Sequence, residues 1–132
     1  MNFTNILREH NLKATPQRLA IINTIDSYGH INIDTLYKEI KQEFDSISLA
    51  TIYKNINMMI ENLLLLEVKL PSNKSVYETI KEKHSHLLCN SCHSVTDVLI
   101  DTKTIVNNIT NDYNFKVKQS DFVVSGICKD CI

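Results

Sequence analysis

Apolar residues recur every three or four positions through the first 64 residues, which is the spacing of helices that bury one face. A short helix is expected over about residues 2–11. A second begins at Thr15-Pro16, because a capping side chain precedes a proline at the first helical position, and it ends at Gly29. Two further apolar stripes follow: Ile33, Leu36, Tyr37, Ile40 and Phe44, then, after Ser48 as the cap, Leu49, Ile52, Ile56, Met59, Ile60 and Leu63.

The pattern changes after residue 64. Two apolar stretches, residues 66–70 and 76–80, flank Pro71-Ser72-Asn73-Lys74, and this composition predicts a β-hairpin. Helices followed by a hairpin are the order of a winged helix-turn-helix domain.

The last third of the chain predicts a second, smaller domain. After the charged stretch Lys81-Glu82-Lys83, we expect strands at residues 86–89 and 95–100, a helix at 101–112 and a strand region at 115–125 that ends in Gly126. The fold class is therefore α+β, in three parts: a winged helix-turn-helix domain in residues 1–80, a hinge linker in residues 81–85 and a small α/β domain in residues 86–132.

Composition excludes some classes and leaves others open. The 132 residues are 43% hydrophobic and 22% charged, which is typical of a globular protein, and no apolar run is long enough for a membrane span. The N-terminus lacks the pattern of a secretory signal, so a cytoplasmic location is expected. The formal net charge of −1 does not favour a nucleic-acid partner. Residues 11–25 and 46–60 contain no acid, however, and any DNA contact must come from such surfaces.

The helix expected after Ser48 carries a polar face. Thr51, Lys54, Asn55 and Met58 are expected on the side opposite the apolar stripe, with Ala50, Tyr53 and Asn57 at its edges.

The four cysteines form two Cys-x-x-Cys pairs, Cys89 with Cys92 and Cys128 with Cys131, separated by 35 residues. Each pair can place two thiolates on one ion at about 2.3 Å, and two pairs complete a tetrahedron. Four sulfur ligands leave no position for a catalytic water, so we predict a structural Zn²⁺ and no enzyme activity. Redox dithiols or unrelated core cysteines are the alternatives. A zinc deaminase would need His-x-Glu and Pro-Cys-x-x-Cys, which the chain lacks.

Two histidines precede the first cysteine pair in the sequence His84-Ser85-His86. Residues two apart on a strand point to the same side, so both imidazoles can face one ion. Spacing alone favours a solvated pair over a metal site, and Glu78 and Asp97 alone would be interpreted as surface carboxylates.

Three motifs together resemble the ferric uptake regulator (Fur) family, in order and spacing over essentially the whole chain. They are Lys13-Ala14-Thr15-Pro16-Gln17-Arg18, Ser48-Leu49-Ala50-Thr51-Ile52-Tyr53-Lys54-Asn55 and His84-Ser85-His86-Leu87-Leu88-Cys89. The resemblance implies a homodimeric, metal-dependent repressor that binds operator DNA, with the second domain as the dimerisation domain and a regulatory Fe²⁺ or Mn²⁺ site at the hinge. The implied regulatory ligands are His30, Glu78, His84, His86 and Asp97. The helix from Ser48 would be the recognition helix, with Tyr53 as its prominent DNA contact. We predict further DNA contacts from the acid-free segments, at Lys13, Arg18, Ala50, Thr51 and Lys54.

The resemblance also bears on the signal. Asp97 is typical of the peroxide-sensing branch, where the iron-uptake branch usually has Glu, whereas Glu78 points to the iron-uptake branch. A further metal site of many iron-uptake members is not expected, because Lys83, Ser85 and Ser120 replace its ligands. We favour a peroxide sensor, with peroxide as its only small-molecule signal. An iron-responsive repressor is the alternative, and a zinc-uptake repressor follows it.

Overall fold

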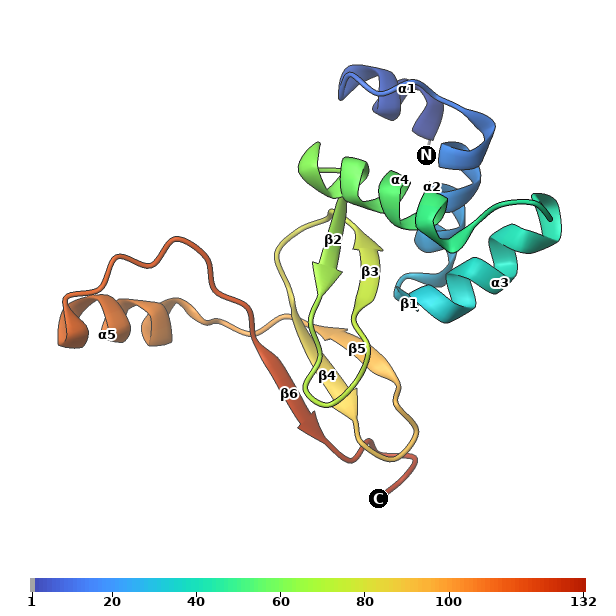
Figure 1. Cartoon of the computed structure of the whole chain (residues 1–132). Coiled ribbons are helices and arrows are strands. Elements are labelled where there is room, and N and C mark those ends of the chain that lie inside the picture. Colours follow the sequence, from blue (N-terminus) through green and yellow to red (C-terminus); the bar gives the residue numbers. More distant parts are fainter. Residues whose placement is uncertain (1) are drawn as a thin grey trace. The chain divides into compact units, whose positions relative to one another are not determined.

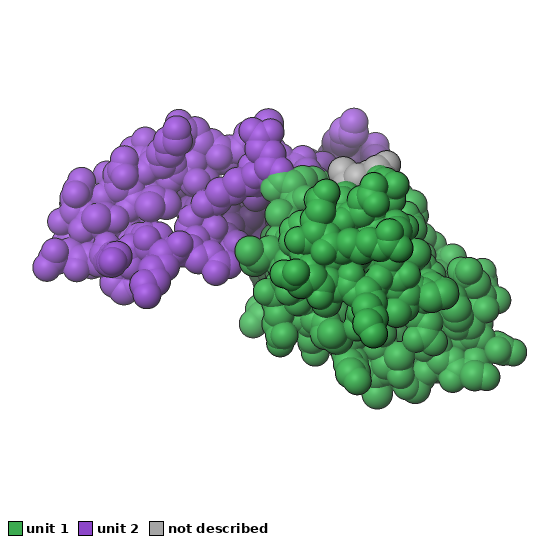
Figure 2. Space-filling model, turned by 90° about the horizontal axis from the view of Figure 1, so that it is seen from above, with its two compact units in different colours: residues 1–81 green, residues 82–132 purple. Residues whose placement is uncertain are grey.

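The computed structural model describes residues 2–132 as an α+β fold of helices and two small sheets (Figure 1). The chain divides into two compact units, unit 1 in residues 1–81 and unit 2 in residues 82–132 (Figure 2). Unit 1 contains α1 (Phe3–Glu9), α2 (Pro16–Tyr28), β1 (Ile31–Asn32), α3 (Ile33–Glu43), α4 (Leu49–Glu61), β2 (Leu65–Val68) and β3 (Val76–Thr79). Unit 2 contains β4 (Ser85–Cys89), β5 (Val95–Val98), α5 (Lys103–Tyr113) and β6 (Val123–Gly126).

Local capping fixes the helix boundaries of unit 1. The Thr15 hydroxyl accepts the Arg18 backbone N–H at 3.3 Å, and Pro16 occupies the first turn of α2. Gly29 closes the helix with φ +79°, a conformation that costs glycine little. Ser48 caps α4 by accepting the Thr51 backbone N–H at 3.1 Å. The predicted helices of unit 1 are thus confirmed, with the predicted start signals of α2 and α4 and the predicted end of α2.

One apolar core joins the helices of unit 1. The fully buried side chains at its centre are Leu7, Ile21, Ile22, Ile25, Leu36, Ile40, Ile52, Ile56, Met59 and Leu65.

The apolar stripe of α4 differs from prediction at both ends. Leu49 is 39% exposed in the first turn, and Leu63 is 71% exposed because the helix has ended and residue 63 has the left-handed φ of 60°. Leu64 takes the buried position instead, and its N–H closes the helix end on the Met59 carbonyl at 2.8 Å. The prediction that Asn55 lies on the exposed face is also wrong, since its side chain is only 8% exposed.

The sheet of unit 1 has the order β1-β3-β2, with both pairs antiparallel. β2 and β3 form the predicted hairpin, and their register places Leu66 opposite Glu78. β1 was not predicted, because two residues are too few to show a period. Its pairing of Ile31 with Tyr77 nevertheless determines where the preceding histidine lies.

The sheet of unit 2 has the order β5-β4-β6, with β4 antiparallel to β5 and parallel to β6. The predicted last strand is shorter than residues 115–125, because only Val123–Gly126 pairs with β4. No side chain of α5 is buried, and Ile105, Ile109 and Tyr113 remain exposed on it. Among the described residues, no helix has both the length and the apolar character to cross a membrane.

Candidate metal centres and nucleic-acid interface

The four cysteines meet at one end of the unit 2 sheet, where β4 and β6 finish side by side. Cys89 is the last residue of β4, and the Asn90 backbone N–H donates to the Gly126 carbonyl at 2.7 Å. This bond brings the turn after β4 next to the turn after β6, which carries Cys128. As a result, the four sulfur atoms lie within 4.8 Å of one another although 35 residues separate the pairs.

The sulfur geometry fits a tetrahedral ion. The Cys92 and Cys128 Sγ atoms are 3.8 Å apart, far beyond the roughly 2.05 Å of a disulfide bond. A tetrahedron with metal–sulfur bonds of about 2.3 Å has edges of about 3.8 Å. All four cysteines are free, so this donor set can hold a Zn²⁺ through four thiolates.

Backbone amides prepare the cluster for negative charge. The N–H groups of Cys92 and Cys128 donate to the Cys89 Sγ at 3.4 and 3.3 Å. These bonds lower the pKa of Cys89 to about 6, and the Ser94 hydroxyl lowers the pKa of Cys92. Hydrogen bonding with the Cys128 thiol raises the pKa of Cys131 to about 12. Four thiolates this close therefore require a cation.

The first cysteine turn has a non-glycine residue where glycine would be easiest to accommodate. His93 has a φ of 62°, and its backbone N–H donates to the Cys89 carbonyl at 2.9 Å. A left-handed conformation costs a residue with a side chain on the order of 1 kcal/mol. The turn therefore keeps its form despite His93, at a cost that is small beside the free energy of zinc binding.

Unit 2 also brings together His84, His86 and Asp97. β4 and β5 pair so that His86 lies opposite Asp97, and His84 lies two residues earlier on the same side. The Asp97 Oδ1 is 3.4 Å from His84 Nε2 and 3.5 Å from His86 Nε2. The two imidazole rings meet edge to face with centroids 4.6 Å apart. Three donor atoms thus converge on one point, as a borderline metal such as Fe²⁺ or Mn²⁺ requires.

Unit 1 contributes a pair, His30 and Glu78. β1 and β3 are antiparallel with Ile31 opposite Tyr77, so the next step of the register places His30 beside Glu78. The His30 Nε2 is 3.0 Å from the Glu78 Oε2. This pair is a nitrogen donor and a carboxylate oxygen at one edge of the sheet, and by itself it is an incomplete ligand set.

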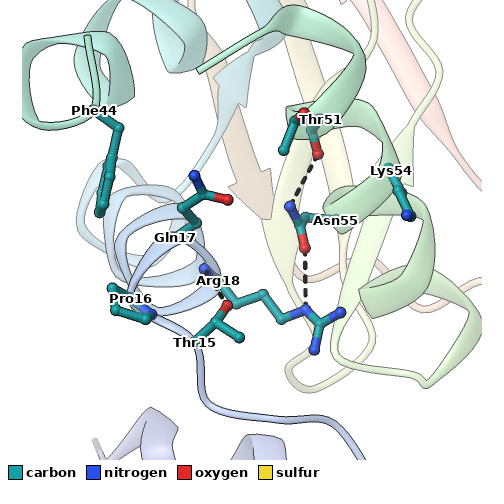
Figure 3. Close-up of a pocket in the computed structure, with 8 residues that line it drawn as sticks. All are labelled: Thr15, Pro16, Gln17, Arg18, Phe44, Thr51, Lys54 and Asn55. Carbon is teal, nitrogen blue, oxygen red and sulfur yellow. Dashed lines mark hydrogen bonds between the residues drawn. The ribbon is translucent and has the colours of Figure 1, made fainter. Parts of the chain in front are cut away.

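The predicted DNA-contact residues of α4 lie on its accessible side. Ala50 and Lys54 are exposed, Tyr53 is 38% exposed, and Thr51 is half-buried beside the cap. Lys13 is exposed in the segment before α2. Between α4 and the first turn of α2 lies an open groove of about 500 Å³ (Figure 3).

Arg18 differs from the other predicted contacts because its side chain is held inside unit 1. It is half-buried, and its Nε donates to the Asn55 Oδ1 at 3.0 Å across the groove (Figure 3). The sequence analysis did not predict that Asn55 is buried and accepts a hydrogen bond from Arg18. A polar residue beside Ile52 and Ile56 on an otherwise apolar face was the signal that could have shown it.

Known proteins share this sequence pattern and architecture. The model of the ferric uptake regulator family matches residues 9–125. The Peroxide operon regulator of Bacillus subtilis is 28% identical over 95% of this chain and 88% of its own length. The Ferric uptake regulation protein of Campylobacter upsaliensis is 34% identical over 98% of this chain and 86% of its own. The crystal structure of the Campylobacter jejuni peroxide stress regulator superposes with a TM-score of 0.72 at 34% identity, covering 99% of this chain and 100% of that one.

A winged-helix unit followed by a small α/β unit with a four-cysteine cluster defines the class of metal-responsive DNA-binding transcriptional regulators. Within that class, the chain belongs to the ferric uptake regulator family.

Proposed function

We propose that the protein is a homodimeric repressor that binds operator DNA in a metal-dependent way and loses DNA on exposure to peroxide. The observation that carries this proposal is the convergence of His84, His86 and Asp97 on one point, with a complementary pair, His30 and Glu78, in unit 1. Of these five donors, the described residues of unit 1 supply two and those of unit 2 supply three. One Fe²⁺ or Mn²⁺ held by both sets would complete the ligand count that the family resemblance implies.

Such a shared ion would act as a switch by linkage. It favours whichever arrangement of the two units lets both ligand sets reach it, and it shifts the population only by its differential affinity for that arrangement. In a dimer, the arrangement sets the distance between two α4 helices, which must match half-sites about one helical turn apart. The exposed apolar side chains of α5, Ile105, Ile109 and Tyr113, support a second copy as the partner of unit 2.

Peroxide sensing rests on the donor set and on Asp97. Iron held by three imidazoles and two carboxylates would activate peroxide, and the imidazole that becomes oxidised would supply the two electrons that reduce it. His30 and His84 are the imidazoles expected to be oxidised, one peroxide oxygen adding to a ring carbon and the other leaving as water. The modified ring is a poorer ligand, so the two units would be released. Each molecule is oxidised once and no catalytic turnover follows, so the protein acts as a sensor. It does so in the cytoplasm, where its four zinc-binding thiols stay reduced.

The iron-loaded protein should therefore lose DNA binding at low peroxide concentration, whereas the manganese-loaded protein should keep it. Mass spectrometry of the iron-loaded sample should find one added oxygen on the peptide with His30 or the one with His84.

Asp97→Glu should keep metal-dependent DNA binding and blunt the loss of DNA binding on peroxide exposure, because the longer arm changes how the carboxylate reaches the ion. Zinc content serves as the control, since cysteine oxidation would eject zinc.

An iron-responsive repressor is the second candidate, and Glu78 together with the similarity to the Campylobacter upsaliensis protein favours it. If iron-loaded protein keeps its DNA after peroxide, with both histidine peptides unmodified, the iron-responsive function replaces the peroxide one. A zinc-uptake repressor is the third. It usually adds a cysteine ligand to the regulatory site, and all four cysteines here belong to the other cluster.

A further inference from the structure

Arg18 connects two segments of unit 1 that are far apart in the sequence. Its Nη1 donates to the backbone carbonyl of Lys13 at 3.1 Å, and its Nε donates to the Asn55 Oδ1 at 3.0 Å. Its Nη2 lies 3.3 Å from the Met58 Sδ. A planar guanidinium directs these donors in fixed directions, so one side chain holds both the segment before α2 and the middle of α4.

Asn55 receives this contact from inside α4. It is buried, and its amide uses both ends: Oδ1 accepts from Arg18, while Nδ2 donates to the Thr51 carbonyl at 3.0 Å (Figure 3). A buried amide with an unsatisfied end costs about 1–3 kcal/mol, so the pair favours one rotation of α4 about its own axis. Asn55 and Met58 are three residues apart, and both therefore lie on the side of α4 that faces Arg18.

We propose that Arg18 is a positioning residue for DNA recognition, acting through Asn55, and not a phosphate contact. The inference rests on the proposed function of α4 as the recognition helix. Lys13 and the exposed face of α4, with Thr51 and Lys54, are the surfaces expected to meet DNA. Arg18 contacts the Lys13 backbone and the Asn55 and Met58 side chains of α4. It therefore fixes the position of Lys13 relative to α4, so that both surfaces can contact the duplex together. The sequence predicts Arg18 as a DNA contact because it lies in an acid-free segment, residues 11–25.

The two roles predict different salt dependence. A lysine or arginine that neutralises a phosphate adds about −0.9 to the slope of log affinity against log salt concentration. A positioning residue changes affinity and sequence preference while leaving that slope as it was. The roles also differ in what lysine can replace. Lysine keeps the charge for a phosphate, but its single ammonium cannot reproduce the Nε and Nη1 bonds together.

The test uses the full-length, manganese-loaded protein and a duplex selected by the wild type from random-sequence DNA. Affinity is measured over a range of salt for Arg18→Lys, Arg18→Ala, Asn55→Leu and the double variant Arg18→Lys/Asn55→Leu. Lys54→Ala is the matched control for a phosphate contact and should reduce the magnitude of the slope by about 0.9. Circular dichroism and zinc content verify folding. If Asn55→Leu fails to fold, the comparison of Arg18→Lys with Arg18→Ala by itself distinguishes a positioning residue from a phosphate contact.

We expect Arg18→Lys and Asn55→Leu each to weaken binding about tenfold or more with the wild-type salt slope. The double variant should be no weaker than the worse single variant by more than about twofold, because both changes break one contact. Wild-type affinity in Arg18→Lys, with a reduced slope in Arg18→Ala, would overturn the inference in favour of a phosphate contact. So would additive losses in the double variant. Failure of the proposed function is a separate result, in which the wild type selects no sequence at all.

Discussion

Cys92→Ser should release the zinc and unfold most of unit 2 while leaving unit 1 folded. The sheet of unit 2 is small, and its helix α5 buries no side chain, so little apolar packing supports the turns after β4 and β6. Structural zinc contributes on the order of 10 kcal/mol to folding, which is comparable to the whole stability of a typical domain. Loss of one of four thiolates removes most of that contribution.

Zinc per chain and thermal unfolding measure this effect, and limited proteolysis shows which unit opens. Asn90→Ala is the matched control, since it lies between the same two cysteines and its backbone bond to Gly126 is retained. The control should keep one zinc and the wild-type melting temperature. A Cys92→Ser protein that also kept both would disprove a structural role for the cluster.

Tyr53→Ala should abolish sequence-specific DNA binding while the metals and the dimer stay intact. Tyr53 is on the accessible side of α4, 38% exposed, one turn after the Ser48 cap that fixes the start of the helix. Removal of an exposed ring leaves the apolar core of unit 1 untouched, so any loss of binding reports on contact with DNA. Non-specific binding should persist, because it depends on lysine and arginine charges.

Electrophoretic mobility shift with the selected duplex and with a scrambled duplex separates the two kinds of binding. Asn57→Ala is the control, because Asn57 is also exposed on α4, one turn further along. Normal, selective binding by a correctly folded Tyr53→Ala protein would show that α4 does not read the operator.

Local signals in the sequence were enough to predict most of the fold. Thr15, Ser48 and Gly29 act within one turn of their own helix, so their effect is visible without any tertiary contact. The two Cys-x-x-Cys pairs were equally readable, because tetrahedral thiolate coordination permits few spacings.

Features that depend on pairing between distant segments could not be read in the same way. β1 is two residues long and exists only because β3 lies beside it, yet it places His30 next to Glu78. The Arg18–Asn55 contact joins residues 37 positions apart, and helical periodicity alone assigned Asn55 to the wrong face. Residues 115–122 have strand-like composition, but only Val123–Gly126 finds a partner in β4. In each case the deciding term is a tertiary contact and not a local propensity.

A manganese titration of DNA binding by four proteins tests most directly whether one regulatory ion bound by both units permits DNA binding. They are the wild type, Glu78→Gln in unit 1 and His86→Leu in unit 2, with Glu67→Gln on β2 as the control. We expect the wild type and Glu67→Gln to bind the selected duplex at the same low Mn²⁺ concentration. Glu78→Gln and His86→Leu should each need at least about 100-fold more while retaining their zinc. If either Glu78→Gln or His86→Leu bound the duplex at the same Mn²⁺ concentration as the wild type, that result would contradict a shared site.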